Sequence, residues 1–206
     1  MLRCWPTTDP LYVAYHDEEW GRPVRDDARL LERLCLEGFQ SGLSWITILR
    51  KRPRFREVFC DFEPAALAAL GEHDVQRLLG DAGIIRHRGK IEATIANARA
   101  TVALQRSGER LTDLLWSFAP QQIAPAPATL AETPASTPES AALARELKRR
   151  GFRFVGPTTA YALMQATGIV NDHVAGCVVR DAVEAERAAA GAVSRGGRRG
   201  SPRRSG

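Results

Sequence analysis

The sequence lacks any apolar run long enough to cross a bilayer, and its first residues lack the apolar core of an export signal. We therefore expect a cytoplasmic chain without a membrane partner. Cysteine is scarce, with four in 206 residues, and inside the cell such cysteines are expected to be thiols or metal ligands rather than disulfides. No segment alternates apolar and polar residues as a half-buried strand does, which predicts a mainly α fold.

Positive charge is concentrated at one end of the chain. The formal net charge is +5, yet residues 187–206 carry six of the 29 basic residues and no acid, so the first 186 residues hold 23 basic and 24 acidic ones. The overall charge therefore says little about what the folded part binds. Beyond about Ala182 the chain is mostly Ala, Gly, Ser and Arg, which predicts a disordered, Arg-rich tail over 183–206.

Apolar residues recur at helical spacing over most of the chain. The predicted helices run from Asp26 to between Gly38 and Gly42, from Ser44 to Lys51, from Pro64 to Leu70, from Glu72 to Leu79, over 87–105, from Leu111 to Phe118, from Thr137 to about Arg150 and from Thr158 onward. Pro53 is expected to end the second of these. The first 25 residues are rich in aromatic side chains and contain three prolines, so we expect an irregular segment that packs on the body and contributes to a site.

The stretch CLEGFQSGLSWITILRKR places one carboxylate, Glu37, among apolar residues. Ionisable groups are seldom left among such neighbours without a partner. A turn at Gly42 and Leu43 would fold the segment back and bring Trp45 toward the carboxylate, giving a hydrogen-bond acceptor beside a flat ring. That arrangement suits a planar ligand with N–H donors. The alternative is a Glu37 that faces solvent at a helix end, beside a core Trp45.

The stretch GFRFVGPTTAYALMQATG has the form of a helix-hairpin-helix. One helix would end at Gly151, a tight turn would contain Gly156 and Pro157, and a new helix would begin at Thr158. Backbone amides at the start of that helix can hold a nucleic-acid phosphate without sequence preference. An ordinary αα-hairpin fits the same pattern, and the residues alone leave both open.

Two pairs of metal-ligating residues lie at opposite ends of the chain. His173 and Cys177 are four residues apart, so on a helix they share a face and can bind one ion. Cys4 and His16 would complete a tetrahedral set of two thiolates and two imidazoles. Four protein ligands leave no open coordination position, so the ion would be structural rather than catalytic. One zinc ion per chain would then join the N- and C-terminal segments, which supply the two pairs of ligands. Free thiols and surface histidines are the alternative.

Several segments, taken together and in order, resemble one family. CW, DPLYVAYHDEEWG, LCLEGFQSGLSWITILRKR, DAGIIRHRGKI, KRRGFRFVGPTTAYALMQATG and VNDHVAGC are similar to the DNA-3-methyladenine glycosylase I (Tag) family of the helix-hairpin-helix superfamily. The similarity runs from residue 1 to about 178. It implies a single helical glycosylase domain over 1–182, with the helix-hairpin-helix at about 139–167 and a zinc site joining the two ends.

The resemblance also implies roles for individual residues. Zinc would be bound by Cys4, His16, His173 and Cys177. The damaged base would be recognised by Glu37, Tyr15 and Trp45, with Glu37 as the catalytic residue and with Trp5 and Tyr12 as further walls of the pocket. A wedge would be inserted into the duplex at Gly42 and Leu43, and the hairpin would contact DNA through Phe154, Val155, Gly156 and Thr158.

The activity implied by the resemblance is base-excision repair. A monomer, associated with the nucleoid through its substrate, would bind double-stranded alkylated DNA, flip out 3-methyladenine and hydrolyse its N-glycosidic bond. Superfamily relatives usually carry a catalytic aspartate where this chain has Asn171, so Asp172 is expected to orient the zinc ligand His173 instead. The segment FRFVGPTT lacks the lysine of bifunctional relatives, which predicts base removal without strand cleavage. A non-catalytic DNA-binding module and a hydrolase of free nucleosides remain alternatives.

Overall fold

The computed structural model describes residues 1–121 and 125–196, with side chains as far as 191. Within these ranges every regular element is helical, which confirms the prediction of a mainly α fold. The elements are α1 (Pro10–Glu18), α2 (Asp27–Gln40), α3 (Trp45–Val58), η1 (Cys60–Phe62), α4 (Pro64–Ala68), α5 (Glu72–Leu79), α6 (Arg88–Arg106), α7 (Leu111–Trp116), η2 (Leu130–Glu132), α8 (Pro138–Arg149), α9 (Pro157–Ala166) and α10 (Arg180–Gly196). None of these helices has the length and apolar character that spanning a bilayer requires.

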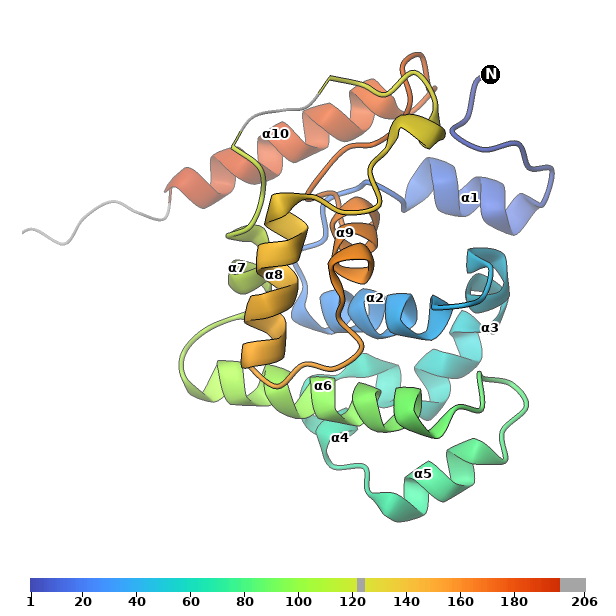
Figure 1. Ribbon diagram of the computed structural model, residues 1–206, viewed down its shortest axis with the longest axis vertical. Helices are drawn as coiled ribbons and strands as arrows, with labels where there is room; N and C mark the ends of the chain where they lie inside the picture. Colours follow the sequence, from blue (N-terminus) through green and yellow to red (C-terminus); the bar gives the residue numbers. More distant parts are fainter. Residues whose placement is uncertain (122–124, 197–206) are drawn as a thin grey trace, which may run out of the picture.

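The helix α2 runs through the middle of the molecule, where it contacts α3, α6, α7 and α9 (Figure 1). The side chains that it buries completely are Leu30, Leu31, Leu36 and Phe39. Its first turn is capped by Asp26, whose Oδ1 accepts from a backbone amide at 2.9 Å. At the other end Lys90 Nζ donates to the carbonyl oxygens of Phe39 and Ser41 at 2.9 and 2.8 Å. Both ends of α2 are therefore fixed, so the polar side chains along it are held in defined places.

The helix α3 continues through Pro53, so the predicted end before this residue is wrong. A proline inside a helix costs about 3 kcal/mol because one backbone hydrogen bond is lost. Beyond it, Phe55 is fully buried with its ring centroid 4.6 Å from that of Phe39, and Val58 is buried as well. Burying two such side chains stabilises the fold by about 1.5 to 3 kcal/mol each, which offsets the cost of the proline.

The expected irregular N-terminal segment contains the helix α1. Asp9 caps it, with Oδ1 accepting from two backbone amides of the first turn at 3.0 and 3.4 Å. Pro10 occupies the first helical turn, where no amide is needed. The helix turns Tyr15 and His16 into the interior, so this segment does pack on the body as expected.

The helix α10 occupies much of the predicted tail over 183–206, and the prediction of disorder is wrong for 183–196. Its Val183 is fully buried. Its Arg187 donates from Nε and Nη2 to two carbonyl oxygens just after α9, at 2.8 and 2.9 Å. In Figure 1, α10 lies across one end of the molecule, over the loop that connects α9 to α10. The rest of the predicted tail, 197–206, lies outside the described residues.

Candidate functional site

A pocket of about 400 Å³ lies between α1, the junction of α2 and α3, and α9. Its lining residues are Trp5, Tyr12, Tyr15, Trp20, Glu37, Gln40, Trp45, Leu130, Thr133, Pro134, Ala162 and Gln165. This volume is within the range of small-ligand pockets. The turn after α2 contains Gly42, whose φ of +84° is a conformation that glycine adopts without strain. Because the chain reverses there, Glu37 of α2 and Trp45 of α3 line the same cavity.

Glu37 is the only carboxylate among the residues that line this pocket. Its side chain is 6 % exposed and forms no hydrogen bond with the residues that the structure describes. Burial raises the pKa of Glu37 to about 8, and the positive charge of Arg33 opposes that shift. A solvent-facing Glu37, the alternative that the sequence left open, is therefore wrong. A buried carboxyl with free acceptor atoms is suited to N–H donors, and a cation beside it favours its ionised form.

Five of the twelve residues that line the pocket are aromatic. The centroid distances are 5.2 Å for Tyr15 and Trp45, 5.1 Å for Trp5 and Tyr12, and 5.1 Å for Trp5 and Trp20. The indole N–H groups of Trp5 and Trp45 and the hydroxyl of Thr133 are buried without a hydrogen-bond partner among the described residues. Because buried polar atoms nearly always have a partner, these three atoms are available to a ligand or to ordered water.

Sequence reasoning missed several lining residues. Trp20 belongs to the aromatic-rich N-terminal segment, so its type and position were a usable signal. Gln165 reaches the pocket from α9, and Thr133 reaches it from the loop before α8. Neither carried a signal in the sequence, because the packing of the helices decides which face of α9 and which part of the loop before α8 meet the pocket.

The four predicted metal ligands, far apart in sequence, form one cluster. The ligand atoms of Cys4, His16, His173 and Cys177 all lie within 4.8 Å of one another. Cys177 Sγ lies 3.4 Å from His173 Nδ1 and 3.5 Å from His16 Nε2, and Cys4 Sγ lies 3.3 Å from His173 Nδ1. Ligands arranged tetrahedrally at ~2.0 to 2.3 Å from a metal ion lie about 3.5 Å apart. The donor set and its spacing therefore fit one metal ion.

Both histidines of this cluster have their second ring nitrogen fixed. His16 Nδ1 lies 2.7 Å from Asp17 Oδ1, which leaves Nε2 directed at the cluster. His173 Nε2 lies 3.0 Å from the carbonyl oxygen of Trp20, which leaves Nδ1 directed at it. Such partners select the tautomer and hold the ring of a metal-ligating histidine. The cluster is therefore already arranged for binding.

Asp172 does not orient His173, and that prediction is wrong. Its Oδ2 accepts instead from Tyr161 Oη and Gln165 Nε2, both at 2.7 Å. The carbonyl oxygen of Trp20 already occupies the second nitrogen of His173. Asn171, at the position of the superfamily aspartate, donates from Nδ2 to a carboxylate of α10 at 2.9 Å and does not line the pocket.

The predicted hairpin is formed by α8, α9 and the loop between them. Phe154 at the loop is 44 % exposed and has a φ of +56°. Thr158 in the first turn of α9 is exposed, and Gly156, the residue that caps this helix, provides no side chain to its amides. The side chain of Val155 is buried, so only its backbone can meet a partner outside the protein.

The turn after α2 and the hairpin loop lie at the same end of α2. A Cβ atom added to Gly38 would lie 3.4 Å from Phe154 Cβ, so the loop packs on the last turns of this helix. Leu43 in the following turn is 41 % exposed. The ring of Phe154 also lies 6.2 Å from that of His87, the residue that caps α6. Two exposed apolar side chains and the start of α9 thus share one edge, beside the pocket.

Comparison with known proteins identifies what this arrangement resembles. Residues 5–181 match the family model for methyladenine glycosylase. The chain is 55 % identical over 179 residues to DNA-3-methyladenine glycosylase 1 of Escherichia coli (strain K12), covering 86 % of this chain and 96 % of that protein. It is 44 % identical over 177 residues to DNA-3-methyladenine glycosylase of Haemophilus influenzae, covering 85 % and 96 %.

Solved structures give the same result. A crystal structure of 3-methyladenine DNA glycosylase I (TAG) aligns with a TM-score of 0.83 and 54 % identity, over 86 % of this chain and 98 % of that one. A tyrosine-to-phenylalanine mutant of 3-methyladenine DNA glycosylase I, in complex with 3-methyladenine, aligns with a TM-score of 0.83 and 31 % identity, over 87 % and 98 %.

Proposed function

The chain belongs to the methyladenine glycosylase family, and on that premise we propose that it excises 3-methyladenine from alkylated DNA. It is a hydrolase of N-glycosyl bonds that acts in base-excision repair. The observation that carries the proposal is Glu37, a buried carboxyl without a hydrogen-bond partner among the described residues, in a pocket walled by aromatic rings. A planar cation with N–H donors is the ligand that such a pocket favours.

Charge and shape select the damaged base. An adenine methylated at N3 within DNA is positively charged and is already a good leaving group, so little acid catalysis is needed. Stacking on Trp45 favours the cationic ring by roughly 0.5 to 2 kcal/mol. Glu37 accepts hydrogen bonds from the N–H groups of the base. The positive charge of the base lowers the pKa of Glu37 and so favours the carboxylate. Tyr15, with Trp5 and Tyr12, completes the walls of the pocket.

The base must leave the duplex before it can enter the pocket, which costs a few kcal/mol. Leu43, exposed beside the pocket on the turn that contains Gly42, is placed to fill the gap in the stack. The first turn of α9, with Gly156 and Thr158, is placed to hold a phosphate through backbone amides. Phe154 would contact the duplex from the same edge, and Val155 would do so through its backbone.

The cluster of two cysteines and two histidines is proposed to hold one structural zinc ion per chain. Thiolates and imidazoles in tetrahedral spacing are the donor set that zinc prefers. All four positions are supplied by the protein, so the ion takes no part in the reaction. It would join α1 and the segment before it to the loop before α10, and through them it would hold one side of the pocket, including Trp5 and Trp20.

The proposed substrate also implies in what form and where in the cell the protein acts. We propose one glycosylase domain over 1–182 that acts as a monomer on double-stranded DNA, in the cytoplasm and at the nucleoid. The hairpin loop carries no lysine between Phe152 and Thr159, so no amine nucleophile is present there and base removal leaves the strand intact.

An assay on methylated duplex DNA tests the proposed function. The purified chain is expected to release 3-methyladenine, identified by chromatography and mass spectrometry, and to leave strands that break only on later alkaline treatment. Binding without any released base would instead support a non-catalytic DNA-binding module. Release from free nucleosides but not from duplex would support a nucleoside hydrolase.

Asn97 connects the hairpin loop to α6, and its replacement by Ala is expected to weaken DNA binding. Its Oδ1 accepts from the amide of Arg153 at 2.7 Å, and its Nδ2 donates to the carbonyl oxygen of the same residue at 3.3 Å. These hydrogen bonds are only partly buried, so losing each is expected to cost about 0.5 to 1.5 kcal/mol. Fluorescence anisotropy with undamaged duplex and urea unfolding measure the two effects. Gln105→Ala, an exposed change on the same helix that removes only a long hydrogen bond of 3.4 Å to Asp27, should leave DNA binding unchanged and stability nearly so.

A further inference from the structure

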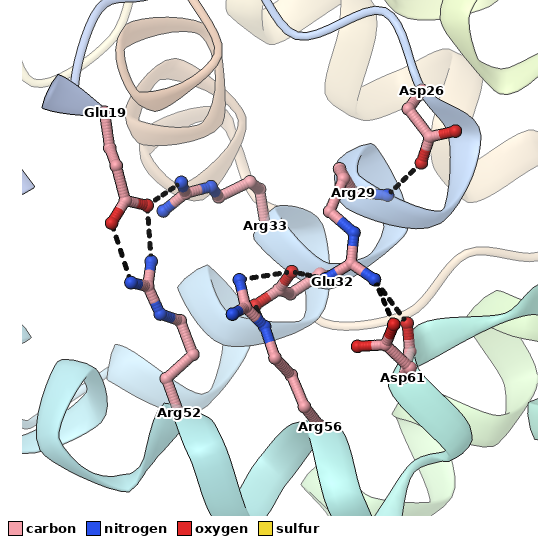
Figure 2. Close-up of polar contacts among 8 residues, drawn as sticks. All are labelled: Glu19, Asp26, Arg29, Glu32, Arg33, Arg52, Arg56 and Asp61. Atoms are coloured by element: carbon pink, nitrogen blue, oxygen red, sulfur yellow. Dashed lines mark hydrogen bonds and ion pairs between the residues drawn. The ribbon is translucent and has the colours of Figure 1, made fainter.

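Two clusters of ion pairs connect α2 to its neighbours (Figure 2). In one, Glu32 accepts from Arg29 of its own helix and from Arg56 of α3. In the other, Glu19, just after α1, accepts from Arg33 of α2 and from Arg52 of α3. Neither cluster contributes a residue to the pocket lining. The second, however, lies close enough to the pocket for its charges to act on Tyr15, and Arg33 also acts on Glu37.

Arg33 is buried, with its side chain 8 % exposed. One end of its guanidinium, Nη2, donates to Glu19 Oε2. The other end, Nη1, is buried and has no hydrogen-bond partner among the described residues. Its Cζ lies 5.5 Å from the ring centroid of Tyr15, a residue of the pocket wall. A charged donor left unpaired inside a protein is costly, so its position needs an explanation.

Glu37 lies within reach of Arg33 along the same helix. The two are four positions apart on α2, a spacing at which an arginine and a glutamate meet on the helix surface. No ion pair joins them among the contacts of the described residues; Glu19 takes the guanidinium instead. Glu19 is itself held by both terminal nitrogens of Arg52, at 2.6 and 2.7 Å. Although burial acts to raise the pKa of Glu19, Arg52 and Arg33 lower it to about 2, so Glu19 stays ionised at every working pH.

We propose that Glu19, fixed by Arg52, holds Arg33 away from Glu37, so that Arg33 acts on the charge of Glu37 without occupying its oxygen atoms. Arg33 and Glu19 are thus positioning residues for the carboxyl that receives the base. This role rests on the proposed function, because only a ligand in the pocket makes a free Glu37 useful. The effect of Arg33 and Glu19 on the pKa of Glu37 can, however, be measured on the protein without DNA.

The sign of each effect follows from the groups that face Glu37. The charged or titratable ones nearest to it are Arg33 on α2 and the pocket-lining Tyr12 and Tyr15 on α1. Glu19 after α1 and Arg52 of α3 lie behind Tyr15, while α9 and the loop before α8 contribute only uncharged side chains to the pocket. Removing Arg33 removes a positive charge, which raises the pKa of Glu37. Neutralising Glu19 releases Arg33 to pair with Glu37, which lowers that pKa. The two changes therefore act in opposite directions, which a general loosening of the pocket would not produce.

Titration of Glu37 by NMR of the glutamate carboxyl carbons, assigned with Glu37→Gln, tests the proposal without substrate. Arg33→Met is expected to raise the pKa of Glu37 by about one unit or more, and Glu19→Gln to lower it by about one unit. The double variant should match Arg33→Met. Arg56→Met, which removes an arginine of α3 from the other cluster, is the matched control and should leave the titration unchanged.

Shifts in one direction for both single variants, or no shift in either, would overturn the proposal. Glu19→Gln keeps the side-chain volume, so it gives a decision even where Arg33→Met fails to fold. Excision assays then connect the titration to function. Glu19→Gln is expected to raise KM several-fold with a smaller change in kcat, because Arg33 competes with the base for Glu37. A wild-type chain that titrates as expected but releases no base would refute the proposed function and leave the electrostatic arrangement standing.

Discussion

Replacing Glu37 by Gln is expected to slow excision of 3-methyladenine about a hundredfold and to leave binding to undamaged duplex unchanged. The substitution keeps shape and one acceptor atom but removes the charge that the cationic base would meet in a buried pocket. Hydrogen bonds to charged groups contribute about 1.5 to 3 kcal/mol, and a hundredfold change corresponds to roughly 2.7 kcal/mol. Single-turnover release of the base and anisotropy with undamaged DNA measure the two quantities.

The pH dependence of the same reaction follows from the pKa of Glu37. Burial raises that pKa to about 8, so the carboxyl is mostly neutral in the free protein below this pH. Binding of a cation favours the carboxylate, and the proton must then be released. The kcat/KM of the wild-type chain is therefore expected to rise as pH increases toward about 8 and to level off above it. The Gln variant should lack this rise.

The matched control is Glu63→Gln. Glu63 is exposed and its side chain forms no hydrogen bond or ion pair among the described residues, so its variant should excise the base like the wild type at every pH. Equal losses of excision and of duplex binding in Glu37→Gln would mean that Glu37 supports the architecture rather than the damaged base.

Local signals predicted most of the helices. The helix α5 spans Glu72–Leu79 as predicted, and α6 is displaced by one residue from the predicted 87–105. Where prediction failed, packing outweighed local preference. Pro53 signals a helix end, but the apolar surface of Phe55 is buried against α2. The Ala- and Arg-rich composition after Ala182 signals disorder, but the residues of α10 find carbonyl groups and an apolar contact on the body.

The sequence predicted the residues that meet the ligand in the candidate site, but not the ion pairs that hold those residues in place. Glu37 and Trp45 flank a turn that contains Gly42, so their meeting in one pocket follows from a short stretch of sequence. The arrangement behind Glu37 does not, because Glu19 and Arg52 come from different elements and meet only when α1 and α3 pack against α2. An arginine and a glutamate four residues apart on one helix predict an ion pair, and tertiary contacts redirect it.

The segment that carries His173 and Cys177 has little apolar support of its own. Its core is a small group of residues separate from the main core, with Val174, Cys177, Val179 and Val183 as its buried members. Both histidines of the cluster are fully buried, with ring centroids 4.9 Å apart. Without an ion, two imidazole nitrogens and two sulfur atoms would face one another in a buried space, with only weak sulfur contacts of 3.3 to 3.5 Å between them. We therefore expect this end of the fold to depend on metal.

Removal of the metal is expected to unfold the N- and C-terminal segments and abolish excision. Structural zinc contributes about 10 to 16 kcal/mol in zinc-finger peptides, comparable with the whole stability of a domain, about 5 to 15 kcal/mol. Freshly purified protein should contain one zinc per chain by elemental analysis, and a strong chelator should lower the melting temperature measured by circular dichroism. Cys177→Ser should lose the metal, whereas Cys60→Ser, a thiol outside the cluster, should keep it. Protein that is free of metal and still melts cooperatively at the same temperature would contradict a structural ion. In that case ring packing and the hydrogen bonds of the Trp20 backbone would suffice to hold the pocket wall at Trp5 and Trp20.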